Sequence, residues 1–216
     1  LNGVYDEETA LITFAVSHQS RYAVGYDPVA LWVNVFGDIS ESAWYYDAVA
    51  YVSHYGLFVG NGGKFMPDDG MTRAMFVTVL WSLEGKPAPG GSASFGDVPV
   101  GTWYHDGVIW AAENGIVAGT GGGNYSPDKT ISRQEMALML LNYSNFKGYA
   151  IPDNREAPDY TDTAQIAVWA ESAAKELSEA GVMGGNNNAF MPQKAACRAE
   201  AAQLIKNFLR LIAGGK

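Results

Sequence analysis

One pattern of residues occurs three times along this 216-residue chain. Each copy contains, in order, an aromatic residue two positions before an aspartate, a tryptophan, two glycines four positions apart, an aromatic-x-proline element and an arginine. The arginines are Arg73, Arg133 and Arg198, separated by 60 and 65 residues, and an apolar segment follows each of them. A unit of about 50 residues cannot bury its own apolar face, so the copies are expected to pack against one another.

Each copy is predicted to form a helix, a loop and a second helix. In the first copy Trp44, Ala48, Val49 and Val52 have helical spacing, and Gly56 supplies the left-handed residue that commonly ends a helix. A second helix is expected to start near residue 72, with apolar residues recurring on one face. Gly and Asn between the helices favour turns because both residues accept positive φ. The predicted fold class is all-α.

Linkers rich in proline, glycine and serine divide the copies. One linker covers 86–94 and the other covers 147–158. The predicted organisation is therefore three tandem repeats, at 36–89, 90–150 and 151–216.

The N-terminal residues 1–35 differ from the rest. The segments 10–16 and 22–24 are rich in residues that favour β structure. We interpret 1–35 as the tail of a preceding β-rich domain or as a linker.

Composition and motif searches exclude several classes of protein. Fourteen basic against 23 acidic residues give a net charge of −9, which has the wrong sign for a nucleic-acid binder. No apolar run reaches the roughly 18 residues of a membrane span. Cys197 is the single cysteine, and His18, His54 and His105 lack the spacing of metal ligands. We therefore expect neither an enzyme nor a cofactor or metal.

The repeated arginine occupies the first turn of a predicted helix, where the helix dipole disfavours a cation. One interpretation is an anion receptor, in which the guanidinium and the N–H groups of the helix N-terminus together bind an acidic group. The other is a structural salt bridge to the aspartate of a repeat, Asp38, Asp97 or Asp162. Both interpretations stay open at this point.

Three further features have both a structural and a functional interpretation. Ser132 and Glu135 have the spacing of a capping box, which is purely structural. The glycine pairs are mainly helix stops, although glycine also allows a ligand to approach the backbone closely. The tryptophans are more often core residues than surfaces that stack on sugar rings; they are Trp44, Trp103 and Trp169.

Taken in order, these landmarks over residues 36–212 resemble the S-layer homology domain family. That resemblance implies a pseudo-threefold trimer of repeats around a central helical bundle. It also implies a non-covalent anchor on the bacterial cell wall, outside the cell. The implied partners are peptidoglycan-associated glycan and a secondary cell-wall polysaccharide whose ketal-linked pyruvate is held in grooves between repeats. Carried over to this sequence, the pyruvyl carboxylate would be contacted by Arg73, Arg133 and Arg198. The grooves would also be lined by Asp38 with Trp44, Asp97 with Trp103 and Asp162 with Trp169.

The copies differ in how well they match that family pattern. The second copy matches best, whereas Met75 replaces the glutamate in the first and Cys197 replaces the hydroxyl residue in the third. The third groove is therefore expected to depart most. Two alternative functions remain: a helical protein–protein module for S-layer assembly, with other S-layer subunits as partners, and the non-catalytic part of a wall-associated hydrolase.

Overall fold

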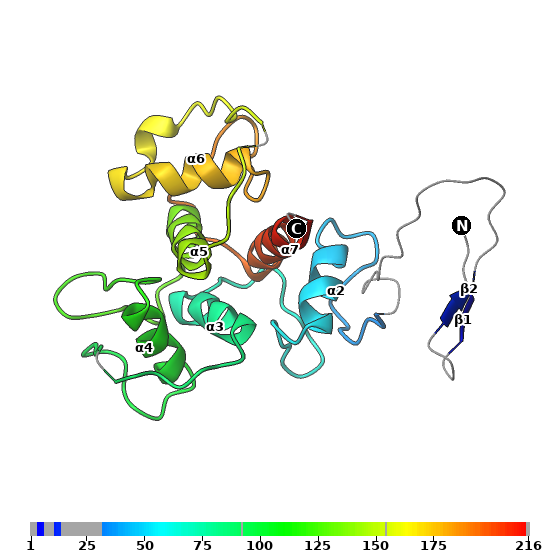
Figure 1. The fold of residues 1–216 in the computed structure, drawn as a ribbon, viewed down its shortest axis with the longest axis horizontal. Coiled ribbons are helices and arrows are strands. Elements are labelled where there is room, and N and C mark those ends of the chain that lie inside the picture. The colour runs from blue at the N-terminus through cyan, green and yellow to red at the C-terminus, as the bar shows by residue number, and fades with distance from the viewer. Residues whose placement is uncertain (1–3, 7–10, 14–31, 92, 154, 215–216) are drawn as a thin grey trace.

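A computed structural model describes residues 4–6, 11–13, 32–91, 93–153 and 155–214 of the chain. Figure 1 shows three lobes around a centre in which three helices converge. The central helices are α3 (Arg73–Leu83), α5 (Arg133–Lys147) and α7 (Arg198–Gly214). The outer helices are α2 (Tyr46–His54), α4 (His105–Glu113) and α6 (Glu171–Glu179), the last preceded by 3-10 turns at Thr163–Gln165 and Val168–Ala170. The all-α class is confirmed for the repeats.

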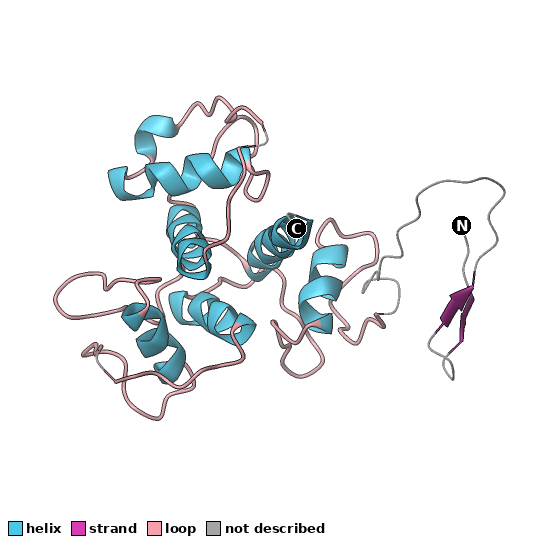
Figure 2. Ribbon diagram, in the orientation of Figure 1, coloured by secondary structure: helices cyan, strands magenta, loops and turns pink. Residues whose placement is uncertain are grey.

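The N-terminal strands lie apart from these helices in the sequence. Strands β1 (Val4–Asp6) and β2 (Leu11–Thr13) pair antiparallel, with Val4 opposite Thr13 (Figure 2). Strand β2 falls inside the β-type segment predicted at 10–16. The second predicted segment, 22–24, lies outside the described residues.

Each central helix begins at its repeated arginine, as the sequence predicts. The Thr72 hydroxyl accepts a hydrogen bond from the Met75 N–H at the start of α3. Ser132 and Glu135 form the complete capping box at the start of α5. In α7 only half of the box is present, because Cys197 has no hydroxyl while its N–H donates to Glu200 Oε2 at 3.2 Å.

The two glycines of each pair have different tasks. Gly115 follows α4 with φ of +69°, in the left-handed region, and so ends the helix as predicted. A Cβ at Gly119 would lie 2.6 Å from the Asn124 carbonyl oxygen and 3.1 Å from the Phe95 ring. The repeated aromatic residue fills the space beside the second glycine. A side chain larger than glycine is therefore excluded at this position, and Gly119 itself lies on the wall of a groove between repeats, where the close-approach interpretation stays open.

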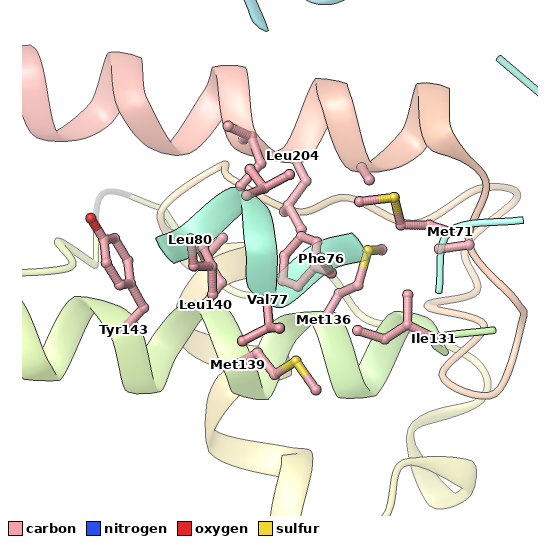
Figure 3. Close-up of a cluster of buried hydrophobic side chains, with 14 of the residues drawn as sticks. Met71, Phe76, Val77, Leu80, Ile131, Met136, Met139, Leu140, Tyr143 and Leu204 are labelled. Atoms are coloured by element: carbon pink, nitrogen blue, oxygen red, sulfur yellow. The ribbon is translucent and has the colours of Figure 1, made fainter. Parts of the chain in front are cut away.

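Each central helix packs against an outer helix of the next repeat. The pairs are α3 with α4, α5 with α6, and α7 with α2. Buried side chains from all three repeats form one hydrophobic cluster. Figure 3 shows its centre, where Phe76 of α3, Leu140 of α5 and Leu204 of α7 come together. The apolar face of each copy is thus buried by the other copies.

Next to this core, backbone hydrogen bonds also join the three repeats into a closed ring. The Met71 N–H donates to the Ala196 carbonyl at 2.8 Å, and the Ala196 N–H donates to the Ile131 carbonyl at 2.9 Å. The Ile131 N–H completes the cycle on the Met71 carbonyl at 2.8 Å. One residue from each repeat therefore joins all three, directly before the central helices begin.

Candidate functional site at the repeat junctions

The repeated arginines lie between repeats and are largely buried. Arg73, Arg133 and Arg198 are only 4%, 8% and 8% exposed. Arg73 extends from the first repeat into the second, where its Nε donates to the Tyr125 carbonyl at 3.0 Å and its Nη2 donates to the Ala118 carbonyl at 3.1 Å. Its guanidinium also lies 4.6 Å from the centre of the Tyr125 ring. The side chain thus holds a loop of the next repeat.

The other two arginines repeat this arrangement. Arg133 Nε donates to the Phe190 carbonyl of the third repeat at 2.8 Å, and Arg133 Nη2 donates to Gly184. Arg198 reaches back to the first repeat, where Nε and Nη2 donate to the Phe65 and Val59 carbonyls, both at 2.9 Å. The three arginines therefore link the repeats in a closed cycle.

The first N–H groups of the central helices are occupied by protein carbonyls. In α3, Arg73 N–H donates to the Lys129 carbonyl and Ala74 N–H donates to the Pro127 carbonyl, both at 3.0 Å. The helices α5 and α7 have the same pair of bonds, from loops of the third and first repeats. The interpretation of these helix N-termini as anion receptors is therefore wrong, because a loop of the neighbouring repeat already caps them.

The repeated aspartates do not pair with the arginines. Asp97 accepts hydrogen bonds from the Tyr125 and Ser126 N–H groups at 2.8 and 2.7 Å. Burial raises the pKa of Asp97, but hydrogen bonds from these two N–H groups and from its own backbone, together with the charge of Arg73, lower the pKa below its ordinary value. Asp38 and Asp162 hold the matching loops in the same way. The predicted salt bridges are thus replaced by a relay, in which aspartate and arginine bind the N–H and carbonyl of one aromatic residue.

A carboxylate and a lysine face Arg73 instead. Glu135 Oε1 accepts from Arg73 Nη1 at 3.1 Å and from Lys129 Nζ at 2.9 Å. Burial would raise the pKa of Glu135, yet hydrogen bonds from Ser132 and Lys129 and the charge of Arg73 lower it. These residues line a groove of about 620 Å³, together with loop 115–120 and Trp169. We call it the first groove.

A second groove, of about 400 Å³, has the same construction one repeat further on. It is lined by Arg133, Lys194, Glu200 and Trp44, together with loop 182–186. Lys194 Nζ lies 2.5 Å from Glu200 Oε1. Burial lowers the pKa of Arg133, and the charge of Glu200 opposes that shift. Both grooves fall in the size range of small-ligand sites.

Part of the second arginine stays reachable from solvent. Arg133 Nη1 has no hydrogen-bond partner among the described residues. In that same part of the chain, the Ser53 hydroxyl is the only side-chain polar atom both fully buried and unpartnered. Arg133 Nη1 therefore keeps contact with solvent at the floor of the second groove, where it can donate to an acidic ligand.

The tryptophans are exposed rather than buried. Trp44, Trp103 and Trp169 are 63%, 59% and 51% exposed, so the interpretation as core residues is wrong. They precede the outer helices instead of lying within them, since α2 begins at Tyr46 and α4 at His105. Trp169 comes from the third repeat to the first groove, and Trp44 comes from the first repeat to the second groove. Each groove therefore combines side chains of all three repeats.

The structure brings together residues that the sequence pattern separates. Glu135 faces Arg73 of the preceding repeat, and its own neighbour Arg133 belongs to the other groove. Lys129 and Lys194 were absent from the predicted site. In two copies the sequence does show a lysine six positions before the glutamate. That spacing indicates a binding site only when the lysine is known to lie beside an arginine 56 or 61 residues earlier in the chain.

Neither metal binding nor a membrane span is evident in the described segments. No group of three His, Cys, Asp or Glu side chains there is arranged to hold a metal ion. The helices found among those residues are too short or too polar to cross a membrane.

The family model for the S-layer homology domain matches this chain three times, at residues 35–75, 94–137 and 159–202. The chain is 30% identical over 213 residues to an amylopullulanase of Thermoanaerobacterium thermosulfurigenes, which covers 97% of the chain and 11% of the relative. It is 26% identical to an endoglucanase of Bacillus sp. strain KSM-635, over 82% of the chain and 19% of the relative. It is 29% identical to the S-layer protein sap of Bacillus anthracis, over 82% and 22%. The chain thus spans between a tenth and a quarter of the length of these relatives.

Proposed function

Because this chain belongs to the S-layer homology domain family, we propose that it is a cell-surface anchoring module whose two grooves bind an acidic cell-wall polysaccharide. The chain carries a net charge of −9, so attraction over long distances cannot hold an acidic polymer. Binding must instead come from cations fixed at particular points. The observation that carries the proposal is that each groove arranges two cations around a single carboxylate.

The side-chain charges of the first groove can be balanced by one anion. Arg73 and Lys129 share Glu135, so the three side chains together leave one net positive charge. Lys129 Nζ is the more accessible cation, since its side chain is 54% exposed. A carboxylate on a ligand would complete the neutralisation with short, charge-assisted hydrogen bonds.

A sugar that carries ketal-linked pyruvate fits this arrangement. The substituent places one carboxylate rigidly against a sugar ring. Trp169 is half exposed at the edge of the same groove, so its indole can cover the apolar face of the ring while Lys129 receives the carboxylate. In the second groove Trp44 and Lys194 have these roles. Pyruvylated secondary cell-wall polysaccharide is therefore the ligand that we propose.

Two grooves on one rigid body explain how weak single contacts give a firm attachment. A polysaccharide repeats its acidic unit, so engagement of one groove raises the effective concentration of polymer at the other. The module would thereby hold its parent protein outside the cell, on the wall of a bacterium. Relatives named as an S-layer protein and as enzymes indicate that different parent proteins carry such a segment. We propose that the segment is itself non-catalytic.

Sedimentation with purified cell-wall sacculi tests the proposal. The double variant Trp44→Ala with Trp169→Ala removes two exposed side chains, so it should fold normally and lose most of its binding. Trp103→Ala is the matched control, because Trp103 is equally exposed and lines neither groove. Its binding should be unchanged.

Walls from which pyruvate has been removed by mild acid should retain little of the unaltered protein. Equal retention on such walls would contradict the proposed ligand. Self-association without glycan, together with no wall binding, would favour a protein–protein module instead. Turnover of wall glycan by this chain would contradict a non-catalytic role.

A further inference from the structure

We propose that the three repeat junctions are not equivalent: the first and second grooves bind an acidic sugar, and the third junction does not. The third junction consists of Arg198, Val59, Asp69 and Met75. The inference rests on the proposed function, and it names the residues that decide which junction accepts an anion. The deciding position is Lys129 in the first groove, Lys194 in the second and Asp69 in the third junction.

Four structurally matched positions separate the third junction from the two grooves. The first groove has Ala118, Lys129, Glu135 and Asn142; the second has Gly184, Lys194, Glu200 and Asn207; the third junction has Val59, Asp69, Met75 and Ser82. At each position the two grooves resemble one another and the third junction differs. The match between positions is fixed by the arginines, because Arg73, Arg133 and Arg198 bond the carbonyls of Ala118, Gly184 and Val59.

These differences make the local charge at the third junction less positive than in the two grooves. In each groove an arginine and a lysine surround one glutamate, which leaves one net positive charge. At the third junction Asp69 balances Arg198 and Met75 is neutral, so no net charge is left. Asp69 is exposed, and it would repel a carboxylate that approached the arginine. The attraction that defines the two grooves is therefore absent.

Among the residues that the structure describes, no second cation acts on Arg198 in place of the missing lysine. The charged groups that act on the Arg198 guanidinium are Asp69 and Asp38, both acidic, and burial lowers the pKa of Arg198 against their effect. Asp38 is already held by the Phe65 and Met66 N–H groups. The side chain of Val59 also replaces the smaller Ala118 and Gly184 at the loop that the arginine holds. Charge thus disfavours an acidic sugar at this junction.

The asparagine that each of the two grooves carries at the matched position points to the same division. Asn142 Nδ2 donates to the Ile116 carbonyl at 3.2 Å, and Asn207 Nδ2 donates to the Val182 carbonyl at 3.1 Å. Each asparagine thus fixes the loop of its own groove. Ser82 at the matched position instead donates to Thr78 on its own helix, at 2.7 Å. Loop 56–60 therefore lacks the support that the other two loops share.

Nuclear magnetic resonance titration of the whole chain resolves the junctions one by one. The probe is a methyl hexoside that carries a ketal-linked pyruvate, with the same hexoside lacking pyruvate as its control. Backbone amide signals of loops 115–120 and 182–186 should shift with the acidic probe, and signals of loop 56–60 should not. Isothermal titration should give two sites per chain.

Charge variants identify the deciding residue. Lys129→Asp should weaken binding about tenfold or more at loop 115–120 and leave the response of loop 182–186 intact. Lys175→Asp makes the same change of charge on the exposed face of α6, and both loops should respond as before. The double variant Asp69→Lys with Met75→Glu rebuilds the arrangement at the third junction. It should add a response at loop 56–60 and a third site.

The outcomes distinguish this inference from the proposed function. A response of all three loops in the unaltered chain, or of one loop only, would overturn the inference and leave an acidic-sugar binder. An unchanged response of loop 115–120 in Lys129→Asp would also overturn it, as would a double variant that stays at two sites. No response at any loop would overturn the pyruvate ligand itself, and the inference with it.

Discussion

Arg198 donates its Nε hydrogen to the carbonyl oxygen of Phe65, 2.9 Å away and 133 residues earlier in the chain. This bond joins the third repeat to the first, just as Arg73 joins the first to the second and Arg133 joins the second to the third. The helix pair α7 and α2 closes the same junction by packing. The repeats therefore form one closed unit, in which each junction depends on contacts between residues distant in sequence.

Closure of the ring predicts a large effect of Arg198→Ala on stability. The substitution leaves the carbonyls of Phe65 and Val59 without their side-chain partner and removes a buried guanidinium from the Phe65 ring, 4.8 Å away. We expect the free energy of unfolding to fall by about 2–4 kcal/mol. Urea denaturation followed by circular dichroism measures it.

Arg210→Ala is the control on the same helix, because Arg210 is exposed and its guanidinium lies over a single ring, that of Tyr51, at 5.9 Å. It should lower the free energy of unfolding by no more than about 1 kcal/mol. Arg198→Lys should recover only part of the loss, since an ammonium group cannot span two carbonyls as the planar guanidinium does. Equal stability of Arg198→Ala and Arg210→Ala would show that the ring does not depend on this side chain.

The architecture could be predicted from the sequence because its signals are local. Gly115 at the end of α4 and Ser132 with Glu135 at the start of α5 act within a few residues of themselves. Spacing alone identifies such stops and caps. Repetition of the pattern then indicates that three copies pack together, because one copy buries too little apolar surface.

The site could be predicted only in part, because its contacts cross between repeats. The sequence selected Arg133 and Trp44, and the structure brings both to the second groove. It could not show that Glu135 faces Arg73 rather than Arg133. The sequence pattern suggests that all the residues of one repeat belong to one site. In the folded ring, the residues of one repeat instead lie at two different junctions.

The aspartate relay predicts a loss of stability in acid. Burial raises the pKa of Asp97, but hydrogen bonds from the Tyr125 and Ser126 N–H groups and from its own backbone, with the charge of Arg73, together leave that pKa lowered in the folded protein. A lowered folded pKa stabilises the protein above the unfolded value of about 4, and that stabilisation is lost as pH falls through the folded pKa. The free energy of unfolding should therefore decrease as pH drops below about 4.

Asp97→Asn removes the charge and should flatten this dependence on pH. The variant should be less stable than the unaltered chain near neutral pH, and the two should converge in acid. Asp159→Asn is a control at an exposed aspartate outside the relay. Parallel curves for Asp97→Asn and the unaltered chain would contradict a role of this carboxylate in acid unfolding.

The contact between the second glycine and the repeated aromatic residue predicts a steric effect. Gly119→Ala would place a Cβ 2.6 Å from the Asn124 carbonyl oxygen, which is backbone and cannot turn away. We expect a loss of about 1–3 kcal/mol in the free energy of unfolding. Gly96→Ala is the control in the same repeat, since its Cβ would meet nothing closer than 3.5 Å. A loss of similar size in both variants would indicate that the clash is not its cause.

Completion of the first capping box should stabilise the chain. The Thr72 hydroxyl already accepts a hydrogen bond from the Met75 N–H, and a glutamate carboxylate at position 75 would accept one from the Thr72 N–H, as Glu135 does from the Ser132 N–H. Met75→Glu should therefore raise the free energy of unfolding by about 1 kcal/mol.

The new carboxylate would also face Arg198 Nη1, which has no hydrogen-bond partner within the described ranges. Met75→Gln separates the two contributions, because glutamine can complete the cap without a charge. A gain with Met75→Glu that exceeds the gain with Met75→Gln, and that shrinks at high salt, would assign the excess to the ion pair with Arg198. Equal gains would assign the whole effect to the cap, and no gain in either variant would contradict the capping argument.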